Sequence, residues 1–335
     1  MEKSNKNSEQ FGDIKTIIEK ITYMKSKIHI PVMPREVLKF LLINEDGVYV
    51  DATAGTGGHT LTLLSKLKNG KIIALEKDAE MVKIFKENVN DARVFIVHTS
   101  YLNLHDILKE LRIEKVDGIL FDLGISSPHV DNPERGFSYD KEGPLDMRFD
   151  QHGTFITAYD IVNGSSFAEL VKILKEGGVN IPTRIARAIV KAREIAPIKT
   201  TTELAKIVKR AFARTFKNKK FRKNVVAPVF QAIRIAVNNE FSELREGLKR
   251  AISSLRVGGR IAIITFHSAE DKIVKDTLKE FARGCVCPPK QPICTCNRKK
   301  TVKFIAKLKP TEEEIEINPR ARSATLRIAE KIAEE

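Results

Sequence analysis

The feature that most restricts the fold of this chain is an alternation of short apolar segments with amphipathic ones. Strands are expected at residues 48–51, 71–76, 93–98 and 117–122, with helical periodicity between them. Strands that alternate with helices at this spacing predict a parallel, doubly wound α/β sheet. A fifth strand is expected at 259–266 and two closing strands at 302–308 and 324–329.

The alternation is interrupted in the middle of the chain. Residues 123–150 are rich in Gly, Pro, Ser and Asp and show no period, so we expect a long loop, and such loops are usually functional. Helical spacing follows at residues 168–175, 183–193, 201–216 and 229–254. We therefore expect an N-terminal extension (1–28), an α/β domain (29–137 and 226–335) and an inserted all-helical domain (138–225).

The charge of the chain indicates a polyanionic partner. Lys and Arg number 58 against 43 Asp and Glu, a formal charge of +15. Such an excess favours nucleic acid or an anionic membrane, although a basic, thermophile-like surface is an alternative. No apolar run reaches the roughly 18 residues of a membrane span, and the first residues lack the apolar core of a signal peptide. We expect a cytoplasmic protein with no membrane partner.

A glycine-rich turn follows the first expected strand. Asp51 is followed by A-T-A-G-T-G-G-H, which ends with Gly57, Gly58 and His59. Glycines let the backbone approach a ligand, and this position in an α/β sheet binds nucleotides. Glu76 ends the next strand, where an acid can accept hydrogen bonds from ribose hydroxyls. The turn lacks the third spaced glycine of a dinucleotide site, and it resembles the first motif of S-adenosylmethionine-dependent methyltransferases.

A second polar motif, D-L-G-I-S-S-P-H, follows the fourth expected strand at residues 122–129. Amino-group methyltransferases carry a short polar motif ending in proline at this place. Acceptors on an exocyclic NH₂ stabilise the positive charge that develops on nitrogen during methyl transfer. Asp122, Ser126, Ser127 and Pro128 are therefore the predicted catalytic residues. No cysteine follows the proline, which favours nitrogen over ring carbon as the acceptor.

Longer motifs make the resemblance specific. The runs at 126–131, 134–138 and 143–148 resemble the MraW family, also called RsmH, the bacterial 16S ribosomal RNA cytosine-N4 methyltransferases. Four more pieces agree, at residues 29–33, 230–238, 265–271 and 318–323. The match is collinear from about His29 to Lys331. It implies a Rossmann-like class I methyltransferase sheet, S-adenosylmethionine as cofactor, and 16S ribosomal RNA of the small subunit as substrate.

The resemblance also implies cofactor-binding residues. Gly57, Gly58, His59 and Asp122 fall on identical family positions. Glu76 replaces a usual aspartate, Tyr101 a usual phenylalanine that would lie near the adenine, and His129 a common glutamine. Asp51 is expected near the methionyl end of the cofactor.

Substrate contacts are expected in three places. Arg135, Asp146 and Arg148 lie in the long loop that could close over the cytosine, or they form a salt-bridged scaffold. His267 follows the fifth strand, where it positions substrate or serves structure. A basic run at 209–223, including Lys219 and Lys220, contains Phe212, Phe216 and Phe221. It could follow RNA phosphates, or it is a solvated face with its phenylalanines in the core.

The four cysteines of the chain are Cys285, Cys287, Cys294 and Cys296. Four thiols this close could bind zinc, although the C-x-C spacing is tighter than usual. Disulfides and free thiols are the alternatives, so we predict no metal beyond this weak candidate. A homodimer is a further expectation about partners. Three functions are alternatives to the main hypothesis: a DNA amino methyltransferase, an RNA chaperone without turnover, and an NAD-dependent dehydrogenase.

Overall fold

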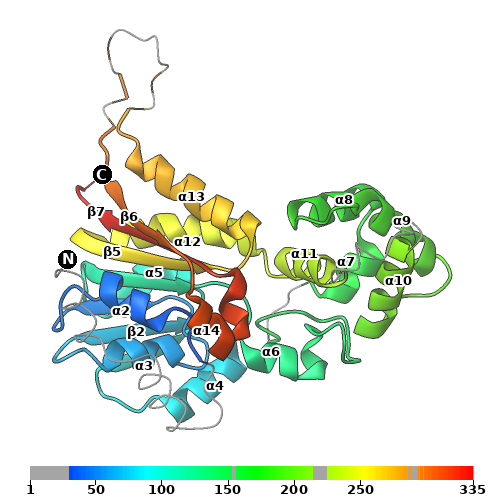
Figure 1. The fold of residues 1–335 in the computed structure, drawn as a ribbon, viewed down its shortest axis with the longest axis horizontal. Coiled ribbons are helices and arrows are strands. Elements are labelled where there is room, and N and C mark those ends of the chain that lie inside the picture. Colours follow the sequence, from blue (N-terminus) through cyan, green and yellow to red (C-terminus); the bar gives the residue numbers. More distant parts are fainter. Residues whose placement is uncertain are drawn as a thin grey trace. The chain divides into compact units, whose positions relative to one another are not determined.

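A computed structural model describes residues 30–152, 156–213, 225–285, 287, 293, 295–296 and 298–334 of the chain. It separates into two compact units (Figure 1). The sheet unit is built from the residues up to Gly124 and from Glu243 onward, and the helical unit is built from Ile125 to Ser242. The expected helix near the N-terminus falls outside the described residues.

The sheet unit contains a seven-stranded sheet in the order β3-β2-β1-β4-β5-β7-β6. The first five strands are parallel where they pair, and β7 runs antiparallel to both β5 and β6. The predicted Rossmann-like sheet is thereby confirmed. The strands are β1 (Val48–Asp51), β2 (Lys71–Glu76), β3 (Val94–His98), β4 (Val116–Asp122), β5 (Leu255–Thr265), β6 (Val302–Leu308) and β7 (Thr325–Lys331).

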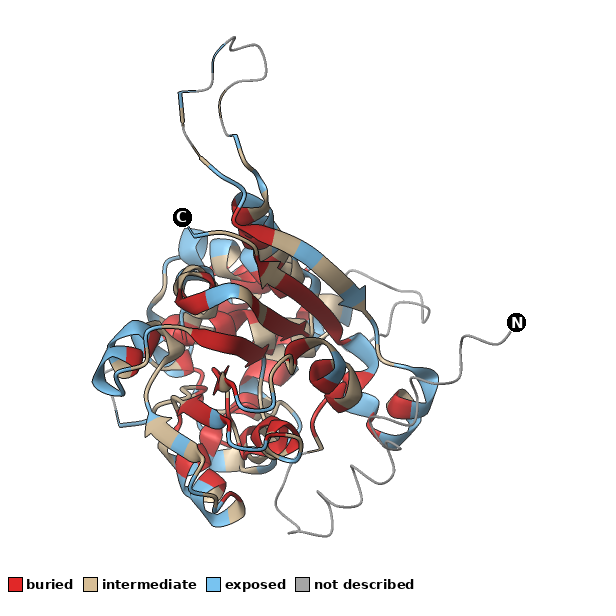
Figure 2. Ribbon diagram, turned by 90° about the vertical axis from the view of Figure 1, so that its left-hand side faces the viewer, coloured by how far each residue is buried: buried red, intermediate tan, exposed pale blue. Residues whose placement is uncertain are grey.

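Helices cover both faces of this sheet because its central strands are apolar on both sides. In β4, Ile119 and Phe121 pack with α5, α12 and α13, whereas Leu120 packs with α2 and α3 on the other face. Figure 2 shows the resulting buried centre. The helices of this unit are α2 (Pro34–Leu41), α3 (Gly58–Leu64), α4 (Ala79–Asn88), α5 (Leu104–Glu110), α12 (Glu240–Ser254), α13 (Ser268–Ala282) and α14 (Glu312–Ile317), with α12 starting just before the unit boundary.

The helical unit has its own apolar core. Leu170, Ile185, Leu204 and Ile233 are fully buried and come from four different helices. Capping boxes begin three of the described helices, at Ser126, Thr157 and Ser166. The helices are α6 (Ser127–Asp131), α7 (Ala158–Gly164), α8 (Phe167–Glu176), α9 (Pro182–Arg193), α10 (Thr201–Ala213) and α11 (Ala227–Val237).

Three sequence-based expectations need correction. The helix expected at 229–254 is two helices, because Asn239 adopts a left-handed φ of 51° between α11 and α12. Residues 123–150 are not entirely loop, since they contain α6 and the short 3-10 helix η2 (Pro133–Arg135). The helical unit is also wider than the expected 138–225, because Phe137 and α11 pack into its core.

Candidate active site

The glycine turn between β1 and α3 has a geometry that requires glycine. Gly57 adopts a φ of +98°, and a Cβ there would lie 2.7 Å from the Cγ2 of Val89. The turn is held from outside by the Asn88 side chain, whose Nδ2 donates to the carbonyl of Thr56 over 3.0 Å. The turn is therefore a close-packed piece of backbone that carries His59 into the first turn of α3.

Asp51 ends β1 and is fully buried. Its Oδ2 accepts a hydrogen bond from the hydroxyl of Thr60 at 2.7 Å. Burial raises the pKa of Asp51, although the nearby His59 opposes the shift. In this structure Asp51 holds α3 against the strand end.

Asp122 and His59 meet at the carboxyl ends of β4 and β1. The Nε2 of His59 lies 3.4 Å from the Oδ2 of Asp122. Burial alone would lower the pKa of His59, but the Asp122 carboxylate raises it above its ordinary value. The backbone N–H of Asp122 donates to the Thr53 hydroxyl at 2.7 Å, which ties the end of β4 to the glycine turn.

Three buried atoms of this pair have no hydrogen-bond partner among the described residues. They are both ring nitrogens of His59 and the Oδ1 of Asp122. Buried polar atoms are nearly always hydrogen-bonded, so such a group at a strand end indicates a place for a polar ligand. A bound molecule with its own donors and acceptors would satisfy them.

Glu76 ends β2 beside the glycine turn. Its two oxygens accept hydrogen bonds from the backbone N–H groups of Gly55, at 2.7 Å, and Asp78, at 2.8 Å. Burial raises the pKa of Glu76 to about 7, in spite of these backbone hydrogen bonds. Each carboxylate oxygen can accept more than one hydrogen bond, so the group retains acceptor capacity for a ribose.

Tyr101 begins the 3-10 helix η1 (Tyr101–Asn103) after β3. Its ring lies edge-on to Phe121, with 5.3 Å between the ring centroids. Gly247 of α12 leaves the space for this ring, since a Cβ there would lie 2.4 Å from it. Tyr101 is thus partly buried in the sheet unit, and its contact with an adenine stays a prediction.

His267 forms the N-cap of α13. Its Nδ1 accepts from the backbone N–H of Glu270 at 3.3 Å, and its Nε2 lies 2.7 Å from a carboxylate oxygen of Glu270. The next acid, Asp271, forms a bidentate pair with Arg327 at 2.6 and 2.9 Å. These contacts support a structural role for His267, and a substrate contact there stays a prediction.

Ser126 and His129 belong to the helical unit. Ser126 caps α6, and its backbone N–H donates to the Nδ1 of His129 at 3.2 Å. The His129 ring is buried against Phe137 and Phe149, with centroid distances of 5.0 and 5.3 Å. The structure thus gives His129 a capping and packing role. The predicted cofactor contact of His129 and the roles of Ser126, Ser127 and Pro128 stay predictions.

The loop residues expected at the substrate are bound to one another and to backbone. Arg148 forms two hydrogen bonds to Asp146, at 3.0 and 2.8 Å, which lower the pKa of that acid against the effect of burial. Arg135 donates to the carbonyls of Arg148 and Phe149, each at 2.9 Å. These contacts match the scaffold alternative for the loop.

Sequence reasoning missed the residue that joins this loop to α11. Buried Asn238 donates to the Met147 carbonyl at 2.7 Å and accepts from the Phe149 N–H at 2.8 Å. Thr53, Thr60 and Asn88, which brace the glycine turn, were also missed. Their position inside or beside the motifs was the one sequence feature that pointed to them. Hydrogen bonds made by single side chains produce no periodic pattern in a sequence.

Part of the basic run lies on α10, where Lys209 and Arg210 are exposed. Phe212 packs against the core of the helical unit, which agrees with the interpretation of these phenylalanines as core. Lys219 and Lys220 lie outside the described residues, as do Phe216 and Phe221. No helix in the described part of the chain is long and apolar enough to cross a membrane.

The sequence is similar to known proteins over nearly its whole length. Residues 26–332 match the model of the MraW methylase family. A protein of Halothermothrix orenii named "Ribosomal RNA small subunit methyltransferase H" is 46% identical over 309 residues, covering 91% of this chain and 98% of that protein. A protein of the same name from Clostridioides difficile is 43% identical, covering 91% and 99%.

Similarity to solved structures is weaker. A structure titled as an rRNA methylase from Streptococcus thermophilus is 12% identical with a TM-score of 0.39, covering 90% of this chain and 94% of that one. A likeness at that level carries no conclusion, whereas the sequence matches are decisive. The motif-based resemblance is confirmed, and the chain belongs to the MraW methylase family.

Proposed function

We propose that the protein transfers a methyl group from S-adenosylmethionine to the N4 amine of a cytidine in 16S ribosomal RNA. Its membership of a methylase family supports the reaction class, and the name of its relatives supports ribosomal RNA of the small subunit as the substrate. The observation that carries the proposal is the contact between His59 and Asp122 near the strand ends, which leaves the buried Oδ1 of Asp122 and Nδ1 of His59 without a hydrogen bond among the described residues.

The residues at these strand ends fit S-adenosylmethionine, which supplies a methyl group on a positively charged sulfur. Glu76 would accept from the ribose hydroxyls, and Tyr101 would lie by the adenine. The turn at Gly57 and Gly58 would let backbone approach the ligand closely. Asp51 and Asp122 lie in the sheet unit, where the positively charged sulfur of the cofactor would bind. Their carboxylates would stabilise that charge.

Asp122 also fits the demands of the acceptor. The amine of cytosine is a poor nucleophile, because its lone pair is delocalised into the ring. An acceptor for the amine hydrogens stabilises the charge that develops on nitrogen during transfer. The Oδ1 of Asp122 has the acceptor capacity for this role. The catalytic roles predicted from the motif for Ser126, Ser127 and Pro128, which belong to the helical unit, are part of the same hypothesis. The methylated amine then loses its extra proton to water.

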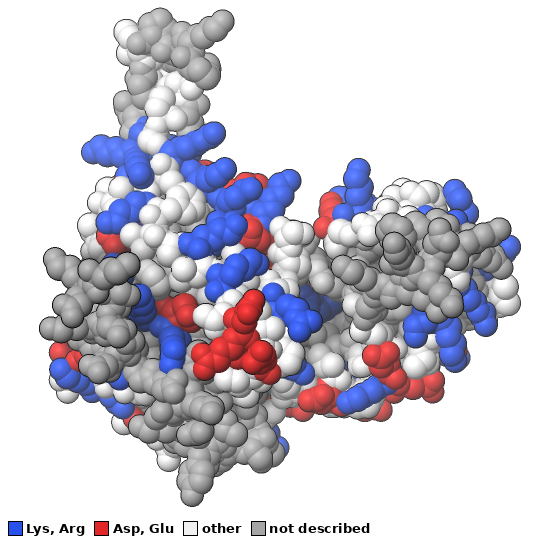
Figure 3. Space-filling model, viewed as in Figure 1, with Lys and Arg blue, Asp and Glu red and all other residues white. Residues whose placement is uncertain are grey.

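Basic side chains in both units support an RNA substrate. Lys209 and Arg210 are exposed on α10 of the helical unit. In the sheet unit, Lys307 near the end of β6 is exposed, and Figure 3 shows further Lys and Arg side chains gathered on one face. Each phosphate contact adds a salt-dependent gain in affinity. The assembled small subunit as partner, a homodimer and a cytoplasmic location are predictions of the same hypothesis.

The direct test incubates the full chain with labelled S-adenosylmethionine and small ribosomal subunits that lack the modification, followed by nucleoside analysis of the RNA. The proposal predicts label in N4-methylcytidine of the 16S RNA. Label on C5 of cytosine, on the ribose, on DNA only, or on no nucleoside would reject it.

A further inference from the structure

A second cluster of reactive side chains lies away from the strand ends, between α13 and β6. The chain leaves the sheet unit after Ala282 and returns at Thr301, whose backbone N–H donates to the carbonyl of Phe281 at 3.0 Å. Of the described residues between 283 and 300, none is buried. Apolar packing therefore does not hold these described residues in place.

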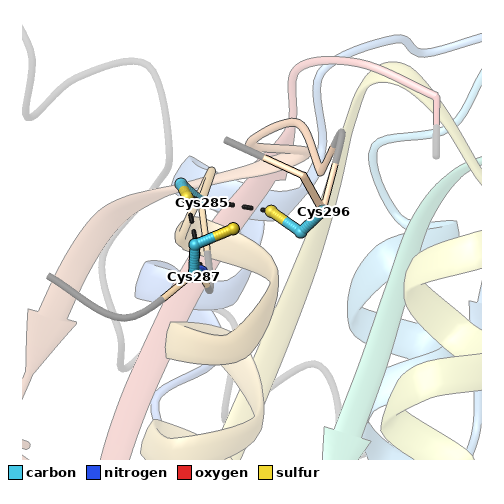
Figure 4. A group of neighbouring side chains, drawn as sticks. All are labelled: Cys285, Cys287 and Cys296. Carbon is cyan, nitrogen blue, oxygen red and sulfur yellow. Dashed lines mark hydrogen bonds between the residues drawn. The ribbon is translucent and has the colours of Figure 1, made fainter. Parts of the chain in front are cut away.

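Three thiols converge in this segment. The sulfur atoms of Cys285, Cys287 and Cys296 all lie within 4.8 Å of one another, as Figure 4 shows. They come from two stretches of chain, one leaving α13 and one returning toward β6. The backbone N–H of Cys287 donates to the sulfur of Cys285 at 3.4 Å, an interaction that stabilises a thiolate in a metal site.

The spacing of the sulfurs fits a metal centre and does not fit a disulfide. The sulfurs of Cys285 and Cys296 are 3.7 Å apart. Two sulfurs bound tetrahedrally to zinc at about 2.3 Å lie about 3.8 Å apart, whereas a disulfide needs about 2.05 Å. None of these three cysteines forms a disulfide with another of the three in the structure.

We propose that Cys285, Cys287 and Cys296 bind a zinc ion that fixes the segment between α13 and β6. Binding converts the three thiols to thiolates and releases their protons to solvent. Soft sulfur ligands favour zinc over magnesium or calcium, and zinc needs no redox partner. Cys294 lies outside the described residues and has no assigned role. The site is independent of the proposed methyl transfer, and its expected contribution is structural.

The test measures metal in the full-length protein. The chain, purified with reduced thiols and loaded with zinc, is passed through gel filtration with a weak chelator, and zinc is counted by elemental mass spectrometry. We expect about one zinc per chain. Cys285→Ser and Cys296→Ser should each lose most of it, and Ile293→Ala, which changes an exposed side chain in the same segment, should retain it.

Two further readouts guard against a variant that merely folds poorly. Cobalt-loaded wild-type protein should show the absorption of a thiolate-bound tetrahedral ion, and this band should weaken in Cys287→Ser. Zinc should also slow proteolysis between residues 283 and 300 in the wild type and not in the variants. A wild type that takes up no zinc, a Cys285→Ser/Cys287→Ser/Cys296→Ser variant that retains it, or a Cys285–Cys296 disulfide in the native protein would overturn the proposal.

Discussion

The two units use buried and partly buried polar side chains in opposite ways. In the sheet unit, His59 and Asp122 keep buried atoms without a hydrogen-bond partner among the described residues. In the helical unit, Arg148 donates hydrogen bonds to Asp146, and Asn238 forms hydrogen bonds with the backbone of the loop. Both sets lie in motifs of the same family, but the first is the set that we propose binds a ligand, and the second holds a loop. Motif membership alone therefore does not separate chemistry from scaffold, whereas hydrogen-bond partners do.

Asp122→Ala is the substitution that most directly tests whether the polar atoms of the sheet unit carry the chemistry. It removes the carboxylate proposed to hold the amine and should lower the rate of methyl transfer at least about 1000-fold. The rate with saturating cofactor and subunits is the measurement. Asp91→Asn is the matched control, because Asp91 pairs with Arg93 just before the amino end of β3, whereas Asp122 is at the carboxyl end of β4. The rate of this control variant should be unchanged. An active Asp122→Ala protein would place the chemistry elsewhere.

Gly57→Ala tests the turn itself. A side chain at a φ of +98° is strained, and this Cβ would also clash with Val89. We expect S-adenosylmethionine affinity to fall about 10- to 100-fold and the free energy of unfolding to fall by about 1–3 kcal/mol. Calorimetric titration and chemical denaturation measure the two effects.

Gly178→Ala is the matched control for that substitution. Gly178, in the helical unit, has a φ of +81° but nothing within 4 Å of its Cβ position. It should lose stability through backbone strain and keep the cofactor affinity. Equal affinity losses in both variants would show that strain, and not the turn's approach to the ligand, is responsible.

Arg148→Ala tests the other side of the comparison. It leaves Asp146 without its bidentate partner, and the free energy of unfolding should fall by about 2 kcal/mol, less than for a fully buried pair. The affinity for S-adenosylmethionine should stay at the wild-type value. A lost affinity with unchanged stability would make Arg148 a binding residue instead of scaffold.

The smallest predicted effect is a pH dependence from Glu76. Because burial raises its pKa to about 7, cofactor affinity should weaken by up to about tenfold per pH unit below neutrality as the carboxylate is protonated. In the protein without cofactor, the stability of the fold changes with pH in the opposite direction. The folded state binds the Glu76 proton more tightly than the unfolded state does. The protonated Glu76 therefore stabilises the fold below pH 4.5, and this stabilisation is lost as the pH rises through about 7. Titrations of wild type and Glu76→Gln across this range measure the effect, and a slope that survives in the variant would assign it to another group.

The sequence predicted the parts of the fold that follow from periodicity. Apolar runs located all seven strands to within a few residues, and the glycine turn, Glu76 and Asp122 fell at strand ends as expected. The break at Asn239 was missed because apolar spacing continues through it. The pair Asn238-Asn239 was the available signal, since asparagine often takes the left-handed conformation that ends a helix. The partners of Asn238 were equally hidden, since its side chain bonds to the backbone of Met147 and Phe149, which lie about 90 residues earlier in the sequence.

The central claim is that the strand ends of the sheet unit hold the cofactor, and a crystal structure with S-adenosylhomocysteine tests it most directly. We predict the ribose hydroxyls at Glu76, the adenine at Tyr101, and a polar group of the ligand within hydrogen-bond distance of His59 or the Oδ1 of Asp122. A ligand bound elsewhere, or one that makes no hydrogen bond to His59 or to the Oδ1 of Asp122, would contradict the account.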